Sequence, residues 1–590
     1  MWGRSSSPKT RRHAAASEGR SPVGQGEAMG TKTTAVVRAV VALVAVGTAA
    51  AQRPAAPAKP VTEAVQVNVV NVEVFAADRD GVPVLDLTPG EFELREDGRV
   101  VPLSNFLAPG AARLAGGAVE AASDGTPAAP LGDDAQRVMV VFADDLNLTY
   151  MGRKRALDRL GEYLDGRVRD GWRVLVVSYD RSLHALTPLT RDPALVAAAM
   201  AALQHTTTEG SMLGLQKQKL LRDMGRPIAG EGGDAGDLMR ESLLRETEMF
   251  AEEQLRLNKS LLESLGRFVD SLAGLPGRKA LLFLSDGVQS RVCDELFREY
   301  QARFPGKSEF IGTMSRYSLS LALQEVTRRA NASGVTFYTI NARPEMGAGQ
   351  GTAEDAVPNQ EAVDTIEAMS RDESMTGFAA GTGGLRLANT RALSDALQRI
   401  TADIEGAYLL GYTPSHFGDG RYHKLSVRST RAGVSVRCRE GYLDKTPAER
   451  QGDRAAAALV AGGNANPLSA TVALGEPEKQ GRNTPAVGLT VYVPAAALTL
   501  LDTGGASEGK VSVTIVVAKA NGATSQAHRE TFPIKVPSQH LAAFRTQRTE
   551  FTFSLLLQPG DRSVSVTARD EVGQVESVVV TDLDVEPEKR

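Results

Sequence analysis

The architecture follows from one segment, Arg137-Val138-Met139-Val140-Val141-Phe142-Ala143-Asp144-Asp145-Leu146-Asn147-Leu148-Thr149. Its first half is an apolar run of the kind that forms a buried strand. A second apolar run, Ala280-Leu281-Leu282-Phe283-Leu284, ends in Ser285-Asp286-Gly287. Because parallel strands bring their carboxyl ends to one edge of a sheet, we expect the two polar loops to meet at a ligand-binding edge.

The side chains that follow the first strand are suited to a metal ion. Asp145, Asn147 and Thr149 stand at alternate positions, and Mg²⁺ prefers such oxygen ligands. Asn and Thr are also common in turns and helix caps, so a plain strand-to-helix turn is the alternative. The neighbouring Asp144 leaves the register open, since either aspartate can face an ion.

From Arg137 onward, strands alternate with helices, which indicates a parallel α/β sheet. We expect strands at 138–142, 173–178, 280–284 and 335–340. We expect helices at 153–167, from Asp192 to about residue 203, within 216–273, and near 364–369 and 393–406. The glycine-rich stretch 381–384 reads as a turn from helix to strand. Residues 134–445 are thus predicted to form a doubly wound, mainly parallel α/β domain with a helical insertion at 214–273 and a C-terminal hairpin at 422–442.

The flanking regions have strand patterning. Residues 62–107 predict a small β domain that contains a hairpin with its tip at Asp97-Gly98. We expect this domain to dock beside the second hairpin, at 422–442. Residues 467–590 predict an immunoglobulin-like β-sandwich that folds alone. Two Ala- and Gly-rich stretches, 108–133 and 446–466, lack apolar periodicity and are interpreted as linkers.

The first 51 residues are typical of a targeting segment. A basic stretch precedes a short apolar run at 39–46, and Ala49-Ala50-Ala51 offers small residues for cleavage. Met29 is an alternative start. We therefore expect a periplasmic or secreted protein with no membrane span after signal removal. A retained amino-terminal anchor is the other interpretation.

Composition excludes several classes of protein. The formal net charge of −4 does not indicate the excess of basic residues that is typical of nucleic-acid-binding proteins. With two cysteines, Cys293 and Cys438, the chain has neither a disulfide framework nor a cysteine zinc cluster. Phosphate-binding and nucleophile-elbow motifs are absent from the sequence, and its seven histidines form no His-Glu-x-x-His motif.

The chain resembles von Willebrand factor A (vWA)-related proteins of the type abundant in Acidobacteria. The resemblance covers roughly residues 65–443. It rests on the metal-loop pattern and on the following further segments: Asp86-Leu87-Thr88, Glu96-Asp97-Gly98, 277–287, 381–384, 408–414 and 438–442. vWA domains carry an Asp-x-Ser-x-Ser metal loop, and here Asn147 and Thr149 stand in place of the serines.

The resemblance implies a metal-ion-dependent adhesion site. Its ligands would be Asp145, Asn147, Thr149, Thr208 and Asp286, with Thr207 as the neighbouring choice for the threonine. Mg²⁺ is the expected ion, with Mn²⁺ or Ca²⁺ as alternatives, and a carboxylate from a protein partner would complete its coordination. Asn147 departs from the family pattern because its carbonyl oxygen lies one atom further from the backbone than a serine hydroxyl.

Three functional interpretations follow. The first is an exported, non-enzymatic binding or scaffolding protein that uses this degenerate metal site to hold a protein partner. The second is a metal-independent structural or assembly factor of the cell envelope. The third is a hydrolase that uses Asp145 and Asp286 around a metal-bound water, for which the sequence offers no general base.

Overall fold

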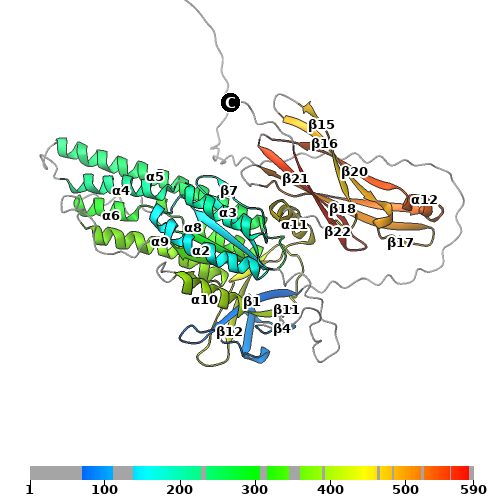
Figure 1. Cartoon of the computed structure of the whole chain (residues 1–590), viewed down its shortest axis with the longest axis horizontal. Coiled ribbons are helices and arrows are strands. Elements are labelled where there is room, and N and C mark those ends of the chain that lie inside the picture. The colour runs from blue at the N-terminus through cyan, green and yellow to red at the C-terminus, as the bar shows by residue number, and fades with distance from the viewer. Residues whose placement is uncertain are drawn as a thin grey trace, which may run out of the picture. The chain divides into compact units, whose positions relative to one another are not determined.

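The computed structural model describes eleven segments of the chain, drawn in colour in Figure 1. They are residues 69–109, 137–206, 208–226, 234–305, 315–343, 359–387, 393–461, 466–480, 484–519, 524–558 and 560–583. The predicted targeting segment and most of the predicted linker at 108–133 lie outside these residues, as does Thr207.

The central element is a six-stranded sheet in the order β10-β9-β8-β5-β6-β7 (Figure 1). Its strands are β5 (Arg137–Asp144), β6 (Arg173–Tyr179), β7 (Leu183–Ala185), β8 (Arg278–Ser285), β9 (Val335–Asn341) and β10 (Arg386–Leu387). All pairs are parallel except β6 with β7. This confirms the predicted parallel α/β sheet. The strand order reverses between β5 and β8, the switch point at which open α/β sheets bind ligands.

Helices cover both faces of this sheet because successive residues of β5 point in opposite directions. Val138, Val140 and Phe142 join one apolar layer, and their neighbours Met139 and Val141 join the other. The first layer includes residues of α4 (Gly210–Gly225), α5 (Asp234–Ser271), α6 (Asp294–Arg303), α8 (Ser320–Ser333) and α9 (Gln360–Thr382). The second includes residues of α2 (Tyr150–Arg169), α3 (Pro193–His205) and α10 (Leu393–Glu405).

Helix α9 is much longer than the predicted helix near 364–369. Its buried face includes the polar residues Glu367, Ser370 and Ser374. Apolar periodicity therefore does not reveal it, since polar side chains occupy positions at which hydrophobic residues would mark a core face.

The predicted turn at 381–384 is confirmed. Gly383 ends α9 in the left-handed region with φ of 82°, where a side chain would be strained. Gly384 then passes so close to β9 that a Cβ atom would lie 1.9 Å from the carbonyl oxygen of Phe337. These two glycines allow the chain to turn directly from α9 into β10.

Two four-stranded sheets share a second core and form what we call the double-sheet domain. One has the order β13-β1-β11-β4 and the other β14-β12-β2-β3. Its strands are β1 (Val70–Ala77), β2 (Phe92–Glu96), β3 (Arg99–Val100), β4 (Asn105–Leu107), β11 (Tyr408–Tyr412), β12 (Tyr422–Ser429), β13 (Ser435–Cys438) and β14 (Gly441–Leu443).

The double-sheet domain mixes strands from both sides of the α/β domain. β1 lies between β11 and β13, and β2 pairs with β12. The amino-terminal strands thus do not form the separate β domain that we expected over 62–107. Each sheet needs strands from both segments to bury its apolar face, so the α/β domain is inserted into the double-sheet domain.

A third core joins two antiparallel sheets at the C-terminal end. One has the order β15-β16-β20, and the other has the order β17-β18-β21-β22 with β19 also paired to β18. These strands are β15 (Thr471–Gln480), β16 (Thr484–Pro494), β17 (Leu501–Asp502), β18 (Ala506–Lys519), β19 (His528–Pro537), β20 (Arg548–Leu556), β21 (Asp561–Asp570) and β22 (Val575–Asp582), with the short helix α12 (Leu541–Arg545). We call this region the C-terminal sandwich.

Most of the predicted linker at 446–466 is a helix, α11 (Pro447–Ala461). It contacts the C-terminal sandwich through Gln451, whose amide lies 3.3 Å from Ser512 Oγ, and through Arg454, which forms an ion pair with Glu576. Alanines of the helix itself, such as Ala455, are buried. Its buried positions hold Ala, Gly and Gln rather than large apolar residues, which explains why the sequence reads as a linker.

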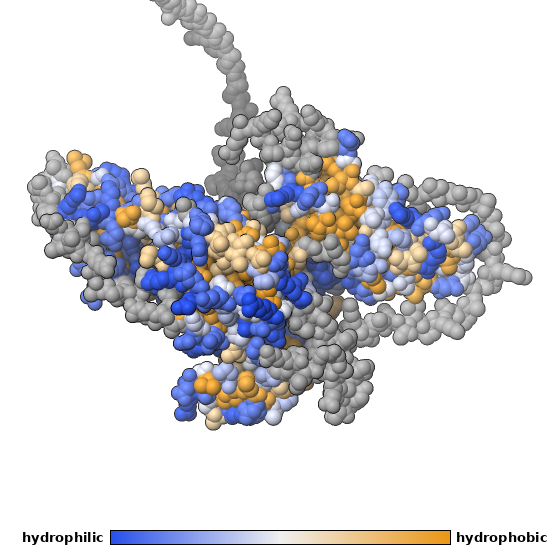
Figure 2. All heavy atoms as spheres, in the orientation of Figure 1, coloured by the Kyte–Doolittle hydropathy of each residue, from blue (hydrophilic) through white to orange (hydrophobic). Residues whose placement is uncertain are grey.

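The visible surface over the helices of the α/β domain is largely hydrophilic, whereas apolar residues gather over part of the C-terminal sandwich (Figure 2). Among the described helices, none combines the length and apolarity needed to cross a membrane.

Candidate functional site

The carboxyl ends of β5 and β8 are joined by a buried polar cluster. Ser285 Oγ donates a hydrogen bond of 2.7 Å to Asp144 Oδ2, and the amide of Asn147 donates to the same oxygen at 2.9 Å. The Asn147 amide also lies 3.1 Å from Asn258 Oδ1 on α5. Burial raises the pKa of Asp144 to about 6. Asp144 therefore holds the loop in place rather than facing an open site.

Asp145 is paired with a cation from its own domain. Arg153 Nη1 on α2 lies 2.9 Å from Asp145 Oδ1, and both side chains are 1% exposed. Thr206 Oγ1 donates to the other carboxylate oxygen at 3.2 Å. Burial raises the pKa of Asp145, and Arg153 opposes that shift. We expected Asp145 to be a metal ligand, but here both of its oxygens are engaged by protein groups.

Thr149 and Asp286 do come together, as the parallel sheet predicts. The backbone N–H of Thr149 donates to Asp286 Oδ2 at 3.0 Å. Thr149 Oγ1 caps α2 by accepting a hydrogen bond from the N–H of Gly152. The other oxygen, Asp286 Oδ1, is buried and has no hydrogen-bond partner. Burial raises the pKa of Asp286 as well.

The loop before α4 contributes a different threonine from the one that we expected. Thr206 contacts Asp145 and Arg153. Thr208 is half-buried and forms no hydrogen bond with the other four predicted ligands. Gly210 then brings α4 against the loop, since a Cβ atom there would lie 2.5 Å from the carbonyl oxygen of Asn147.

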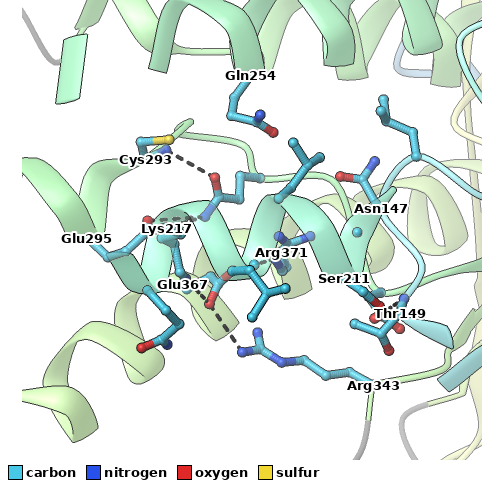
Figure 3. A pocket seen from close by; sticks show the side chains of 18 of the residues that line it. Asn147, Thr149, Ser211, Lys217, Gln254, Cys293, Glu295, Arg343, Glu367 and Arg371 are labelled. Atoms are coloured by element: carbon cyan, nitrogen blue, oxygen red, sulfur yellow. Dashed lines mark hydrogen bonds and ion pairs between the residues drawn. The ribbon is translucent and has the colours of Figure 1, made fainter. Parts of the chain in front are cut away.

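A pocket of about 270 Å³ opens beside Asn147, Thr149 and Asp286 (Figure 3). Five charged side chains on its wall form a connected network: Lys217 on α4, Glu295 on α6, Arg343 after β9, and Glu367 and Arg371 on α9. Lys217 Nζ lies 2.6 Å from Glu367 Oε2. Arg343 and Arg371 approach Glu367 at 3.1 and 3.0 Å.

This network fixes the charge of Glu367. Burial disfavours its ionised form, but Arg371, Lys217 and Arg343 together hold its pKa well below the usual range. The pKa of Glu295 is raised because it is fully buried. The pocket therefore contains fixed charges of both signs.

Three buried polar atoms on residues that line the pocket have no hydrogen-bond partner. They are Asp286 Oδ1, Gln254 Nε2 and Arg343 Nη1. Buried polar groups are nearly always hydrogen-bonded, and an unpaired one costs about 1–3 kcal/mol. One acceptor and two donors thus remain for a bound group.

The arrangement does not fit a magnesium ion. Mg²⁺ requires near-octahedral oxygen coordination. Asn147 directs its amide N–H groups at Asp144 and Asn258, and Asp145 is held by Arg153. Asp286 Oδ1 is unpartnered and Asn147 Oδ1 accepts none of the described hydrogen bonds, but two acceptors fall short of an octahedral shell. The guanidinium groups of the pocket also add positive charge beside Asp286.

The sequence contained signals for some of the residues that we missed. Arg153 stands one turn before Ala156 and Leu157 on the apolar face of α2, which predicts a buried arginine. Glu367 and Arg371 have i,i+4 spacing. Lys217 carried no such signal because it lies in a charged stretch.

No family model and no curated protein match the sequence. Among solved structures, proximal thread matrix protein 1 from the mussel byssus is 12% identical over 45% of this chain and 47% of its own, with a TM-score of 0.20. BatB from Bacteroides thetaiotaomicron is 11% identical over 46% and 99%, with a TM-score of 0.19. The pilus tip protein Mfa5 from Porphyromonas gingivalis is 9% identical over 87% and 76%, with a TM-score of 0.24. The chain thus spans about half the length of the mussel protein.

Proposed function

We propose that this chain is a non-enzymatic binding protein that holds a group of a protein partner in the pocket at the carboxyl ends of β5 and β8, without a bridging metal. The observation that carries the proposal is the set of three buried, unpartnered polar atoms on residues that line the pocket. A partner that donates to Asp286 and accepts from Gln254 and Arg343 would satisfy all three.

The size of the pocket supports a small occupant. Pockets for small molecules are usually about 300–1,000 Å³, and this one is about 270 Å³. A side chain or a chain end of the partner fits this space better than a large cofactor does. Leu215 on the pocket wall is 62% exposed, and Met212 on the same helix is 60% exposed. They supply apolar surface on which the rest of a partner can pack.

The chemistry of the wall argues against catalysis. Cys293 is the thiol of the pocket, and burial raises its pKa well above the usual value, so it is not an activated nucleophile. Ser211 Oγ accepts a hydrogen bond from the N–H of Tyr150. The described lining includes neither histidine nor tyrosine, and its buried carboxylates Glu295 and Glu367 are engaged by Lys217.

Export belongs to the same proposal. The sequence of the first 51 residues is the support for a periplasmic or secreted location. There the α/β domain would present its pocket to a partner, and the two β domains would act as spacers or additional contacts.

Site-specific photo-crosslinking tests the proposal. A photo-reactive amino acid at Leu215 should crosslink one partner from extracts of the source cells, whereas the same residue at the exposed Arg159 on α2 should not. Asp286→Asn should lower the yield roughly tenfold or more, the value of a lost hydrogen bond to a charged group. Equal crosslinking at both positions, or an unchanged yield in Asp286→Asn, would contradict a pocket-mediated contact.

A metal-bridged contact is the second candidate, favoured by the buried unpartnered oxygen of Asp286. The same crosslinking in excess Mg²⁺ and in chelator separates the two candidates. Equal yields support the metal-independent contact, and a yield that requires Mg²⁺ supports the bridge.

A further inference from the structure

The double-sheet domain contains two histidines and four carboxylates in one cluster. His423 and Glu96 lie on the neighbouring strands β12 and β2, and His416 lies in the loop after β11. The remaining members are Asp97, Asp419 and Asp444. None of these residues belongs to the pocket of the α/β domain. The cluster therefore requires its own explanation.

Each histidine is held through Nδ1 by a carboxylate. His416 Nδ1 lies 2.8 Å from Asp444 Oδ2, and His423 Nδ1 lies 2.8 Å from Asp97 Oδ2. An ionised carboxylate only accepts hydrogen bonds, so Nδ1 carries the hydrogen in both rings. In a neutral ring with hydrogen on Nδ1, the lone pair is on Nε2 and can bind an ion. His416 Nε2 forms no hydrogen bond, whereas His423 Nε2 hydrogen-bonds Asp419 and would exchange that hydrogen for the ion. Metal-binding histidines are oriented by carboxylates in the same way.

The two Nε2 atoms face further carboxylates. His416 Nε2 lies 3.3 Å from Glu96 Oε1, and it is buried without forming a hydrogen bond. His423 Nε2 lies 3.2 Å from Asp419 Oδ2. Ligands about 2.0–2.1 Å from a tetrahedral Zn²⁺ are roughly 3.3 Å apart. The ligand atoms of Glu96, His416 and His423 all lie within 4.8 Å of one another.

The charges of the cluster also favour a cation. Among the described residues, Arg450 is the arginine paired with these carboxylates, with its Nη2 3.3 Å from Asp444 Oδ1, and its single charge does not balance all four. Tyr412 and Tyr442 donate hydrogen bonds to Glu96 Oε1, which keeps that carboxylate in place between the sheets. A divalent cation would offset the remaining negative charge.

We propose that Glu96, His416 and His423 bind a transition-metal ion of the Zn²⁺ class, with Asp419 as an additional oxygen ligand and Asp97 and Asp444 positioning the rings. Imidazole ligands select Zn²⁺, Cu²⁺ or Ni²⁺ over Mg²⁺. This site is separate from the proposed partner pocket and does not depend on it.

Binding has a structural consequence. The two rings are stacked with centroids 3.8 Å apart and planes 13° apart, so one ring must turn before both Nε2 atoms face one ion. The ion then ties Glu96, which precedes the α/β domain in the chain, to two residues that follow it. A metal that binds only the folded state stabilises that state.

Titration of the whole chain tests the site. After removal of metals with a chelator, Zn²⁺ is titrated by calorimetry, and Co²⁺ is followed by the visible absorption of tetrahedral cobalt. We expect one ion per chain and a higher thermal midpoint of unfolding with Zn²⁺. His416→Ala and His423→Ala should each lose this binding.

Two further variants control the interpretation. His184→Ala removes a histidine that also contacts an aspartate, Asp180 at 2.8 Å, but that lies outside the cluster, and it should bind Zn²⁺ normally. Asp444→Asn keeps the shape of the side chain and should weaken binding by about 10- to 100-fold. Circular dichroism of each metal-free variant verifies folding.

Three outcomes would overturn the proposal. They are the absence of Zn²⁺ and Co²⁺ binding by the wild-type chain, undiminished binding by folded His416→Ala and His423→Ala, and equal loss of binding in His184→Ala. Crosslinking at Leu215 is unaffected by any of them, so failure of this site and failure of the proposed function are distinguishable.

Discussion

Arg153 places its guanidinium 2.9 Å from the carboxylate of Asp145, and each side chain is 1% exposed. The positive charge at the end of β5 thus comes from α2. Removing one partner of a buried ion pair leaves an uncompensated buried charge, which costs about 3–5 kcal/mol.

Arg153→Met should therefore lower the free energy of unfolding by about 3–5 kcal/mol. The buried Trp172, directly before β6, reports on this domain by fluorescence during urea denaturation, provided that Trp2 is replaced by Phe. Arg159→Met removes an exposed arginine of the same helix and should change stability by less than about 0.5 kcal/mol. The double variant Asp145→Asn/Arg153→Met should recover part of the loss. A cost below about 1 kcal/mol for Arg153→Met would show that the pair is not buried as described.

Removal of Mg²⁺ should leave the α/β domain unchanged, because an internal cation already pairs with Asp145. We expect no saturable heat when Mg²⁺ or Mn²⁺ is titrated into the chain, and the same Trp172 unfolding midpoint in chelator and in excess Mg²⁺. Asp145→Ala serves as the comparison. Saturable Mg²⁺ binding that disappears in Asp145→Ala would reinstate the metal site predicted from the sequence.

The ion pair between Glu91 and Arg431 should make the double-sheet domain sensitive to acid. A hydrogen bond from Arg431, at 2.7 Å, is the main cause that lowers the pKa of Glu91 to about 2 from 4.5. A carboxylate whose pKa is lowered by folding stabilises the folded state at pH values above its pKa in the unfolded chain, 4.5. This contribution is lost as the pH falls from 4.5 toward 2. The difference in thermal midpoint between wild type and Glu91→Gln should therefore be constant from pH 7 to about 5 and shrink below that.

The control for this pH dependence is Glu93→Gln on β2. Its carboxylate also contacts an arginine, Arg95 at 2.7 Å, but the contact is more exposed. Differential scanning calorimetry should show a smaller effect of Glu93→Gln than of Glu91→Gln at neutral pH. A Glu91→Gln effect that stays the same at pH 3 would be inconsistent with the ion pair.

Helix α11 should resist proteolysis. Arg450 and Arg454 are potential trypsin sites, but Arg454 is paired with Glu576 and the helix lies on the C-terminal sandwich. Arg226, at the end of α4, has a side chain that is 74% exposed and should be cut first. Mass spectrometry of early digestion products measures the order of cleavage. An early cut after Arg450 or Arg454 would support the linker that the sequence predicted, and Glu576→Ala should shift cleavage in that direction.

The strands of the α/β domain were predictable because β5 and β8 are continuous apolar runs and their carboxyl ends carry polar loops. The meeting of Thr149 and Asp286 follows from the same logic. The role of Arg153 could have been read from the apolar face of α2. The charged network of the pocket could not be predicted from the sequence. Lys217 and Glu367 come from different helices, and tertiary packing rather than local pattern sets how those helices lie.

The double-sheet domain was the least predictable part of the fold. Its strand patterning was visible, but pairing of β1 with β11 depends on contacts between segments far apart in the chain. Period-two patterning specifies which face of a strand is buried and does not specify the partner strand.

The insertion of the α/β domain into the double-sheet domain also delays strand pairing while the chain is being synthesised. The N–H of Leu87 donates a hydrogen bond to the hydroxyl of Tyr408, 321 residues later. A ribosome that adds about 5–20 residues per second needs roughly 16–64 s to cover that distance. During this interval β1 and β2 have been made, but β11 and β12, which pair with them, have not. The α/β domain can complete its sheet first, so the nascent chain carries the apolar faces of β1 and β2 uncovered until β11 and β12 emerge.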